Sequence, residues 1–485
     1  MMNKAAANLL DRFSSCSSQD SAICETKTIA GSRMFVTAIV FVLVVLTLSV
    51  GCKKYKPPKM STSKNVRKGA IVGSSMAPCL VGKHYQCNCS ECGNTFRCDI
   101  EQADEREFLV CPNCGFGKID RHNPASCEPI PEQAVEITIE GPPPQRWQMV
   151  VFSMIGMTDP VGKTGIKRVV GMPGEVITFH DGNIFANGTL LQKPIDIQKK
   201  VRVPVYDSSF YSDRFKRWVG FEGAKWNCDS KRIGPVESTK GELVWAAYRQ
   251  HRCYATKKDA DKVVSIEDNY GFNQSLTRDL HSVDEIFLEA DVEYSASSIV
   301  GLRYRKRSVD YEFQIDIAKK SLAFTTVGAG RNDGKRKEAT QIDPMTNSVV
   351  RDAINSSKKL KLELTSFDSR LVLLINQKQV FTLQIEPETV DADATEAADN
   401  SERDPMQIQI GVNDPAASFR RVRIWRDLYY YPAPETAQKN SELDAMDGFI
   451  VLGDNVPISV DSRYWNMPSV AAPFVIGTVD LPQKQ

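Results

Sequence analysis

Alternating apolar and polar residues recur in the second half of the chain, in short segments bounded by turn residues. Leu360, Leu362 and Leu364, for example, alternate with Lys361 and Glu363, as expected of a strand with one buried face. No long amphipathic helix is expected between residues 283 and 432, and the pattern is typical of a β-sandwich. The nine predicted strands are residues 286–294, 299–305, 311–317, 322–326, 360–367, 370–375, 379–385, 406–412 and 420–429.

An unbroken apolar run lies near the start of the chain. Residues 34–50 carry no charge, and at about 1.5 Å per residue they are just long enough to span a bilayer core with their flanks. We expect a transmembrane helix at residues 34–51, preceded by a cytoplasmic tail at residues 1–33. In two alternative interpretations this segment is cleaved. It could be a secretory signal, although such a signal normally begins closer to the amino terminus. It could also be a lipoprotein signal, as Gly51 and Cys52 suggest, although the leucine expected in such a motif is missing.

Composition adds limits but no function. The chain has 485 residues, of which 42% are hydrophobic and 25% charged, with a net charge of +1. These are ordinary globular values that suggest two to four domains. The near-neutral charge argues against a nucleic-acid partner.

Two basic residues lie inside an apolar run. Residues 165–175 read Gly-Ile-Lys-Arg-Val-Val-Gly-Met-Pro-Gly-Glu, and the glycines and proline predict a turn after a strand. Neighbouring strand residues point to opposite faces, so we expect one of Lys167 and Arg168 to be buried and the other to face water. A buried amine can lose its proton whereas a guanidinium stays charged, which makes Lys167 a candidate general base. The alternative is a solvated basic pair at a strand end.

Two further segments carry candidate chemistry. Residues 72–80 read Val-Gly-Ser-Ser-Met-Ala-Pro-Cys-Leu. A serine hydroxyl needs a base before it can act as a nucleophile, and none of the five histidines lies in an apparent triad setting, so a lysine base fits better. The third segment, residues 448–465, is an apolar run followed by a polar turn that contains Ser459, Asp461 and Arg463.

In this order, and behind a membrane anchor, the three segments resemble the type I signal peptidases, which are membrane-bound Ser/Lys proteases that remove signal peptides from exported proteins. The resemblance covers roughly residues 34–82, 145–196 and 445–482, and includes a short apolar strand at 149–152 and a hairpin at 181–188. The matching positions are Ser75, Met76, Pro78 and Leu80; Lys167, Arg168, Val169, Gly171, Pro173 and Gly174; and Gly453, Asp454, Asn455, Ser459, Asp461, Ser462 and Arg463.

The resemblance implies roles for these residues. Ser75 would be the nucleophile and Lys167 the general base, while Ser459 would orient the lysine amine. Asp461 and Arg463 would form a structural ion pair behind the site.

It also implies that the backbone N–H of Ser75 holds the oxyanion. Some family members carry a second, side-chain donor two residues before the nucleophile. That position is Gly73 here, so Ser74 is the alternative donor.

The implied activity is that of a serine endopeptidase acting on preprotein signal peptides, with small side chains one and three residues before the cut and no cofactor for catalysis. The implied location is the cell (inner) membrane, single-pass, with an extracytoplasmic catalytic domain. Seven Lys and Arg residues between positions 53 and 68 conflict with this topology under the positive-inside rule, unless that segment lies on anionic lipid headgroups. The rival enzyme class, the self-cleaving repressors of the DNA-damage response, is soluble and lacks such an anchor.

A cysteine-rich insert is expected at residues 84–128. Two Cys-x-x-Cys-Gly motifs, 18 residues apart, suit a tetrahedral zinc ion and resemble a zinc ribbon. The alternative is a disulfide-linked loop. Four thiolates leave no open position for water, so the metal would be structural, and a Pro-rich linker at residues 129–144 would lead back to the protease. The expected ligands are Cys89, Cys92, Cys111 and Cys114, with Cys87, Cys98, His122 or Cys127 as substitutes.

The fold class that follows is mainly β. A signal-peptidase-like catalytic domain, at residues 64–82, 145–200 and 440–482, would be interrupted by the zinc ribbon and by a second insert at 205–435. That insert weakly resembles the concanavalin-A-like jelly rolls and would bind a glycan or protein ligand. A rival function is therefore a membrane-anchored zinc- and glycan-binding scaffold with little protease activity.

The aromatic, acidic and cysteine residues of this insert carry further expectations. We expect Tyr304, Tyr311 and Trp425 in the core rather than on a binding face. Residues 386–404 would form an acidic, solvated loop, and Cys228 and Cys253 would pair only if oxidised.

Overall fold

The computed structural model describes residues 65–139, 141–154, 164–229, 232–237, 241–253, 262–306, 309–328, 344–356, 359–385, 406–433 and 442–480. The chain divides into two compact units, Met1–Ser63 and Lys64–Gln485. The predicted tail, the anchor at 34–51, Cys52 and the acidic loop at 386–404 lie outside the described residues. Among the residues that are described, no helix is both long and apolar enough to cross a membrane.

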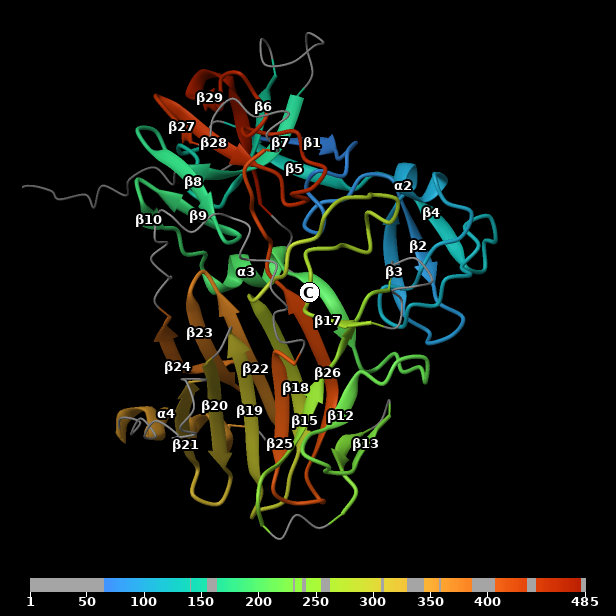
Figure 1. Ribbon diagram of the computed structural model, residues 1–485. Coiled ribbons are helices and arrows are strands. Elements are labelled where there is room, and N and C mark those ends of the chain that lie inside the picture. Colours follow the sequence, from blue (N-terminus) through green and yellow to red (C-terminus); the bar gives the residue numbers. More distant parts are fainter. Residues whose placement is uncertain are drawn as a thin grey trace, which may run out of the picture. The chain divides into compact units, whose positions relative to one another are not determined.

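A seven-stranded antiparallel sheet forms the frame of the predicted catalytic part (Figure 1). It packs against a four-stranded sheet through buried residues such as Val170, Ile177 and Ile450. The first sheet has the order β1 (Asn65–Ala70), β5 (Ala134–Ile139), β30 (Val475–Val479), β6 (Met149–Ser153), β7 (Thr164–Gly171), β28 (Gly448–Leu452) and β29 (Ser469–Ala471). The second has the order β10 (Thr189–Leu190), β9 (Asn183–Ala186), β8 (Val176–His180) and β27 (Leu443–Asp444).

Strand β5 corrects the sequence prediction, because it lies inside the segment expected to be a linker. It pairs with β1 along its whole length and with β30 through Ile137 and Thr138. The prolines that suggested a linker fall before and after the strand, where they remove no ladder hydrogen bond. The predicted hairpin is present as β8 and β9, joined at Asp181 and Gly182, which both have positive φ.

Two further sheets form the predicted β-sandwich, and all nine predicted strands are present. Their inner faces share one core that includes Leu288, Leu302, Phe313, Leu362 and Ile424. One sheet has the order β13 (Trp226–Cys228), β14 (Ile233–Pro235), β26 (Ser418–Arg426), β18 (Ile286–Glu293), β22 (Leu360–Phe367), β23 (Arg370–Ile375) and β24 (Lys378–Gln384), with β11 (Val203–Asp207) also on β26. The other has the order β12 (Trp218–Gly220), β15 (Val244–Tyr248), β25 (Ile408–Val412), β19 (Ile299–Lys306), β20 (Val309–Asp316) and β21 (Ser321–Gly328).

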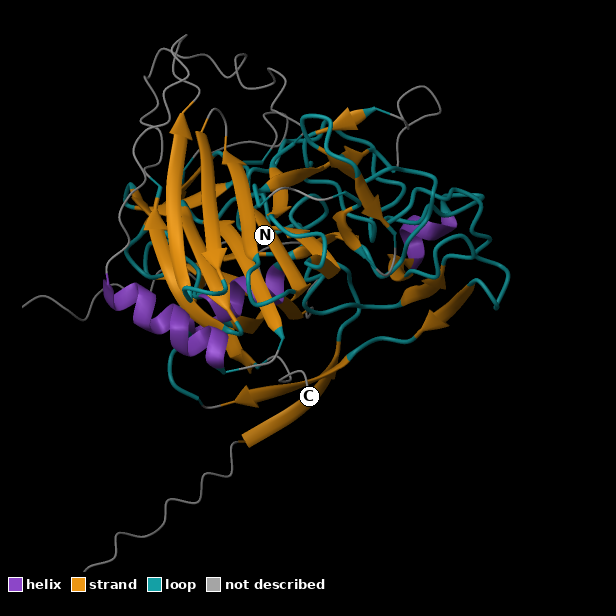
Figure 2. Ribbon diagram, turned by 90° about the horizontal axis from the view of Figure 1, so that it is seen from below, coloured by secondary structure: helices purple, strands orange, loops and turns teal. Residues whose placement is uncertain are grey.

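A helix was missed within this sandwich, although no long amphipathic helix was expected there. Helix α4 (Pro344–Asn355) follows β21 and lies beside the sandwich strands (Figures 1 and 2). Val350, Ala353 and Ile354 are buried on its inner face and join the sandwich core. Their spacing of three and four residues is that of an amphipathic helix, so the prediction of an insert without one is wrong.

The cysteine-rich insert contains a small three-stranded sheet of order β3 (Thr95–Asp99), β2 (His84–Asn88) and β4 (Cys127–Ile130). Helix α2 (Ile100–Asp104) follows β3 directly in the chain. The core of the insert is made mainly of cysteines, with Phe96 and Leu109 among the few larger apolar side chains. Among the described residues, the remaining elements are β16 (Gln250–His251) paired with β17 (Val263–Val264), helix α3 (Ile195–Val201) and the short helix η2 (Ala472–Phe474).

The sandwich contacts the predicted catalytic part at a buried lysine just before α3. The Lys193 ammonium contacts the carboxylates of Asp368 and, at 3.0 Å, Asp427, and Glu285 lies in the same cluster. Burial alone would lower the pKa of Lys193, but the neighbouring carboxylates more than offset this and raise it. The lysine therefore supplies a buried positive charge to this acidic cluster, and Arg370 lies 3.9 Å from Asp368.

The aromatic side chains considered for ligand binding are not on an open face. Tyr304 and Tyr311 are buried in the sandwich core, as expected. Trp425 is half-buried, and the Arg202 guanidinium lies 3.7 Å from its ring centroid. These three rings thus offer no exposed platform for a glycan.

Candidate active site and metal centre

The predicted nucleophile and base meet. Ser75 lies in the turn that follows β1, and Lys167 lies on β7, where it pairs with Val150 of β6. The Lys167 amine and the Ser75 hydroxyl are 2.5 Å apart, within hydrogen-bond distance. Residues 92 positions apart in the chain therefore form one polar contact.

The environment of Lys167 favours its neutral form. Its side chain is only 7% exposed, and burial is the main cause that lowers its pKa to about 8. The negative charge of Asp461 opposes this shift, and the positive charge of Arg463 adds to it. With a pKa of about 8, roughly a tenth of the amine is unprotonated at pH 7, far more than for an exposed lysine.

Arg168 differs from the expectation that only one of the two basic residues would be buried. It is 2% exposed, and its Nε and Nη2 donate to the two carboxylate oxygens of Asp454 at 2.7 and 2.6 Å. Nη1 donates to the Trp147 carbonyl. A buried guanidinium is tolerated because a bidentate carboxylate satisfies it.

The segment after β28 contacts the turn that contains Ser75. The Asn455 N–H donates to the Ser75 carbonyl at 2.9 Å, and the Asn455 side-chain amide donates to the Ser74 carbonyl at 3.1 Å. Gly453 is required by close approach: a Cβ there would lie 2.1 Å from the Ser459 hydroxyl and 2.5 Å from the Ser75 carbonyl oxygen. Any side chain at position 453 would push these two groups apart.

Ser459 is in place but makes no side-chain hydrogen bond. Its hydroxyl is buried and has no partner among the described residues, so the expected bond to the lysine amine is not formed. The predicted ion pair behind the site is present. Arg463 donates to both carboxylate oxygens of Asp461, at 2.9 and 3.0 Å, and Asp461 also accepts from the Gly453 N–H.

Ser74 points to the cysteine-rich insert. Its hydroxyl donates to the carboxylate of Asp99, the residue that caps helix α2, so in this arrangement it is engaged away from an oxyanion. Within the described part of the chain, no acceptor lies in hydrogen-bond reach of the Ser75 N–H. That backbone group is thus available as an oxyanion donor.

The four expected zinc ligands lie together. Their sulfur atoms are all within 4.8 Å of one another, with Cys89 and Cys114 at 3.6 Å and Cys92 and Cys111 at 3.7 Å. Zn–S bonds of about 2.3 Å in a tetrahedron require sulfur separations of about 3.8 Å, so the cluster fits a zinc ion.

The turns around this cluster fit the same interpretation. Gly93 and Gly115 follow the two motifs with positive φ, which a glycine adopts without strain. Their N–H groups donate to the carbonyls of Cys89 and Cys111. Each motif is therefore closed into a tight turn that directs two sulfurs to one point.

The proposed substitute ligands lie elsewhere. Cys87 and Cys127 form a disulfide between β2 and β4. Cys98 is buried against the Phe272 carbonyl, and His122 is exposed. Cys228 and Cys253, the other pair considered, are both free thiols.

Metal content tests this site directly. We expect atomic emission of the purified protein to find about one zinc per chain, because a tetrahedral set of four cysteine sulfurs is a typical zinc site. The variant Cys111→Ser will lose most of that zinc and become more sensitive to proteolysis within residues 84–128, since so small a core depends on its metal. Cys228→Ser is the control and will retain the metal. Equal zinc in both variants would contradict the ligand assignment.

Sequence reasoning named Asp454, Asn455 and Asp99 either only as motif positions or not at all. Asp454 and Asn455 belong to the third segment. The charge of Arg168 was a signal that could have assigned Asp454 as its partner, whereas nothing in the sequence indicated the contacts of Asn455. Nothing in the sequence marked Asp99, because its partner Ser74 lies in another segment 25 residues away.

Comparison with known families finds one match. The family model described as signal peptidase, peptidase S26, matches residues 31–238, a range that contains the serine and lysine segments and the cysteine-rich insert. This match supports a relation to the signal peptidase family. No curated protein matches the chain.

Among solved structures, the similar chains include a carbohydrate-binding module from Bacillus subtilis, with 12% identity over 43% of this chain and 95% of that chain and a TM-score of 0.22. A β-glucanase from Bacillus licheniformis shows 5% identity, coverage of 46% and 97%, and a TM-score of 0.24. A galectin from Caenorhabditis elegans shows 10% identity, coverage of 29% and 81%, and a TM-score of 0.17.

Proposed function

We propose that this chain is a membrane-anchored serine endopeptidase that removes N-terminal signal peptides from exported preproteins. The observation that carries the proposal is the 2.5 Å contact between the Ser75 hydroxyl and the buried Lys167 amine. Its support comes from the family model, which matches the region that contains both residues.

The proposed reaction is acyl transfer through a covalent intermediate. Neutral Lys167 accepts the hydroxyl proton of Ser75 as Oγ attacks the scissile carbonyl carbon, and the Ser75 N–H donates to the developing oxyanion. The protonated lysine then donates that proton to the leaving amine as the C–N bond breaks, which leaves an acyl-enzyme and neutral Lys167. The same amine next takes a proton from the water that attacks the acyl carbon, and it returns that proton to Ser75 Oγ as the ester C–O bond breaks, which restores the Ser75 hydroxyl and neutral Lys167.

The charged groups near Ser75 and Lys167 would leave the lowered pKa of Lys167 almost unchanged. Two guanidiniums are buried near it, and each is neutralised by its own carboxylate, Arg168 by Asp454 and Arg463 by Asp461. Neutralised neighbours add little net field at the amine, so burial remains the dominant cause of its lowered pKa. Ser459 is proposed to accept a hydrogen bond from the lysine once the substrate is bound.

For location, we propose a single-pass anchor at residues 34–51 in the cell (inner) membrane, with the catalytic part on the extracytoplasmic side. The Cys87–Cys127 disulfide supports this, because disulfides persist in oxidising compartments. The basic segment at residues 53–68 would then lie on anionic lipid headgroups. The zinc ion, held by the four cysteines, would stabilise the insert and take no part in the chemistry.

A cleavage assay tests the activity. Purified full-length protein in detergent will be incubated with a labelled preprotein whose signal peptide carries alanine one and three residues before the cut, and the product's new N-terminus will be sequenced. Cleavage at that junction is the expected result. A preprotein with a large aromatic residue at the position before the cut is the control and will stay intact. No cleavage of the first substrate would instead favour a binding scaffold.

The pH dependence of cleavage reports the base. Only unprotonated Lys167 can accept the serine proton, so kcat/KM will rise about tenfold per pH unit below the lysine pKa and level off above it. The inflection is expected near the Lys167 pKa of about 8. The rate will be measured with an internally quenched peptide from about pH 6 to pH 9. A flat profile, or a rate that falls as the pH rises through this range, would contradict a lysine base.

A further inference from the structure

We propose that a loop of the sandwich insert, residues 268–281, positions the nucleophilic serine through Asn273 and Phe272. The inference rests on the proposed function, and it concerns residues that lie outside the three segments that resemble a known family. This segment is called the bridging loop below. Asn273 and Phe272 are therefore proposed as positioning residues, not catalytic residues.

The bridging loop is closed at its base and is fastened to the sandwich. Glu267 and Ser282 form an isolated β-bridge, and the Asp268 N–H donates to the His281 carbonyl at 2.9 Å. The Asp268 carboxylate contacts the Arg278 guanidinium and the His281 ring, at 2.9 and 3.0 Å. A loop with a closed base and its own internal contacts is a compact Ω-type loop.

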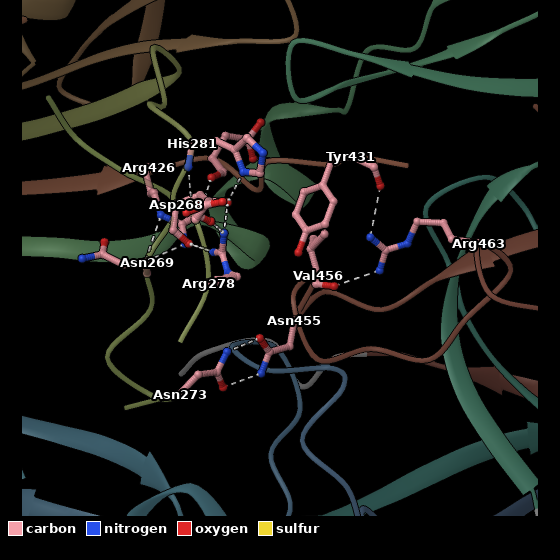
Figure 3. A network of polar contacts seen from close by, with 12 residues as sticks. Asp268, Asn269, Asn273, Arg278, His281, Arg426, Tyr431, Asn455, Val456 and Arg463 are labelled. Carbon is pink, nitrogen blue, oxygen red and sulfur yellow. Dashed lines mark hydrogen bonds and ion pairs between the residues drawn. The ribbon is translucent and has the colours of Figure 1, made fainter. Parts of the chain in front are cut away.

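The end of strand β26 anchors this base. Arg426 is buried and donates to the backbone carbonyls of Asp268 and Asn269, at 2.7 and 2.8 Å (Figure 3). The base of the loop is thus fixed on the sandwich, and its tip extends to the turn that contains Ser75.

At the tip, Asn273 meets Asn455 in a reciprocal amide pair (Figure 3). Asn273 Nδ2 donates to Asn455 Oδ1 at 2.6 Å, and Asn455 Nδ2 donates to Asn273 Oδ1 at 2.9 Å. Both side chains are buried, with 6% and 1% exposed. Asn455 is the residue whose N–H and side-chain amide bind the Ser75 and Ser74 carbonyls, so Asn273 fixes the orientation of the amide that holds the nucleophile turn.

Phe272 supports the same turn from another side. Its buried ring packs against Ala77 and Val81, which follow the nucleophile. Its carbonyl accepts from the Asp99 N–H at 3.0 Å, and Asp99 accepts from the Ser74 hydroxyl. The bridging loop therefore reaches the serine turn by three routes: the Asn273 amide, the Phe272 ring and, through the cysteine-rich insert, Asp99.

These contacts matter for rate because a serine turn has no regular hydrogen-bond ladder of its own. An attacking oxygen must lie within a few tenths of an ångström of its productive position, and a displacement of about 1 Å caused by a remote change can cost about 10²-fold in rate. We infer that the sandwich insert contributes to catalysis by holding this turn, whatever else it binds.

The test is Asn273→Ala in the full-length protein. The variant will lower kcat about 10- to 100-fold for the quenched peptide, with KM changed less than about twofold, because Asn273 is buried against Asn455 and acts on the Ser75 turn rather than on the substrate. The inflection of the pH profile will not shift, since Asp461 and Arg463, whose charges act on the Lys167 pKa, are unchanged in the variant. Thr277→Ala, an exposed change on the same loop, is the matched control and will keep the wild-type kcat.

A double-variant comparison separates positioning from general destabilisation. If Asn273 acts through Asn455, the variant Asn273→Ala with Asn455→Ala will be no slower than Asn455→Ala alone. Additive losses of kcat in the double variant, or full activity of Asn273→Ala, would overturn the proposal for the bridging loop. Neither result would affect the proposed function, which depends on cleavage by the wild-type protein.

Phe272→Leu keeps the proposal testable if Asn273→Ala does not fold. It keeps an apolar side chain but removes ring contacts with Ala77 and Val81, and a loss of kcat at unchanged KM is again expected. An unchanged kcat in this variant, with wild-type thermal unfolding, would count against the loop. Failure of the wild-type protein to cleave any preprotein would refute the proposed function itself.

Discussion

Ser75→Ala and Lys167→Met will each abolish preprotein cleavage, with kcat/KM lowered by at least about 10³-fold. The first variant removes the attacking oxygen, and the second removes the group that accepts its proton. Lys167→Arg will be equally inactive because a guanidinium does not deprotonate near neutral pH. The measurement is the initial rate of product formation from the quenched peptide at the wild-type pH optimum.

The double variant Ser75→Ala with Lys167→Met sharpens this test. Residues that act as one unit show strongly non-additive losses, so the double variant will be no slower than either single one. Lys83→Met, which removes a lysine that is 60% exposed near the same turn, serves as the control and will retain activity. More than a few per cent of wild-type activity in Lys167→Arg or Lys167→Met would refute the assigned base.

The contact between Ser75 and Lys167 could be predicted from the sequence because the two residues lie in recognisable local patterns. Lys167 precedes a glycine- and proline-rich turn, and Ser75 lies in a short segment without a competing histidine. The burial of Arg168 could not be predicted in the same way. Its partner Asp454 lies 286 residues away, and strand alternation, which considers only neighbours, assigned one face to water although both faces are covered.

The fold shows the same division between local and distant information. The nine sandwich strands have a period-two pattern that any half-buried strand must show, and all were found. Strand β5 was hidden by flanking prolines, and its identity depends on β1 and β30, which come from opposite ends of the described chain. Helix α4 was missed because its apolar face is only Val350, Ala353 and Ile354 among the residues whose burial is described.

The two inserts also explain why the nucleophile turn needs no long local structure. Both are anchored next to it: Asp99 of the cysteine-rich insert binds Ser74, and the bridging loop of the sandwich binds Asn455. A turn held by groups from two inserts keeps its shape only while both inserts are folded. Loss of zinc is therefore expected to slow cleavage as well as to loosen the insert.

Breaking the buried pair between Arg168 and Asp454 will cause the largest loss of stability. Asp454→Asn keeps the shape but removes the anion, which leaves a guanidinium that is 2% exposed without its counter-charge. Removing one partner of such a pair typically costs about 3–5 kcal/mol in the free energy of unfolding. The loss will be measured by urea titration. Glu132→Ala, which breaks the exposed contact with Lys83, is the control and will cost less than about 1 kcal/mol.

A second substitution decides whether the charge or the packing is responsible. Burying two apolar side chains in place of a buried ion pair is often neutral or stabilising, so Arg168→Met together with Asp454→Leu will recover most of the stability that Asp454→Asn loses. If Arg168→Met with Asp454→Leu is as unstable as Asp454→Asn, the unpaired charge is not the cause of the loss. The stability of this region would then come from the directed hydrogen bonds of Arg168 to Trp147 and Asp454. The position of the β7 strand, and with it of Lys167, would then depend on those directed bonds.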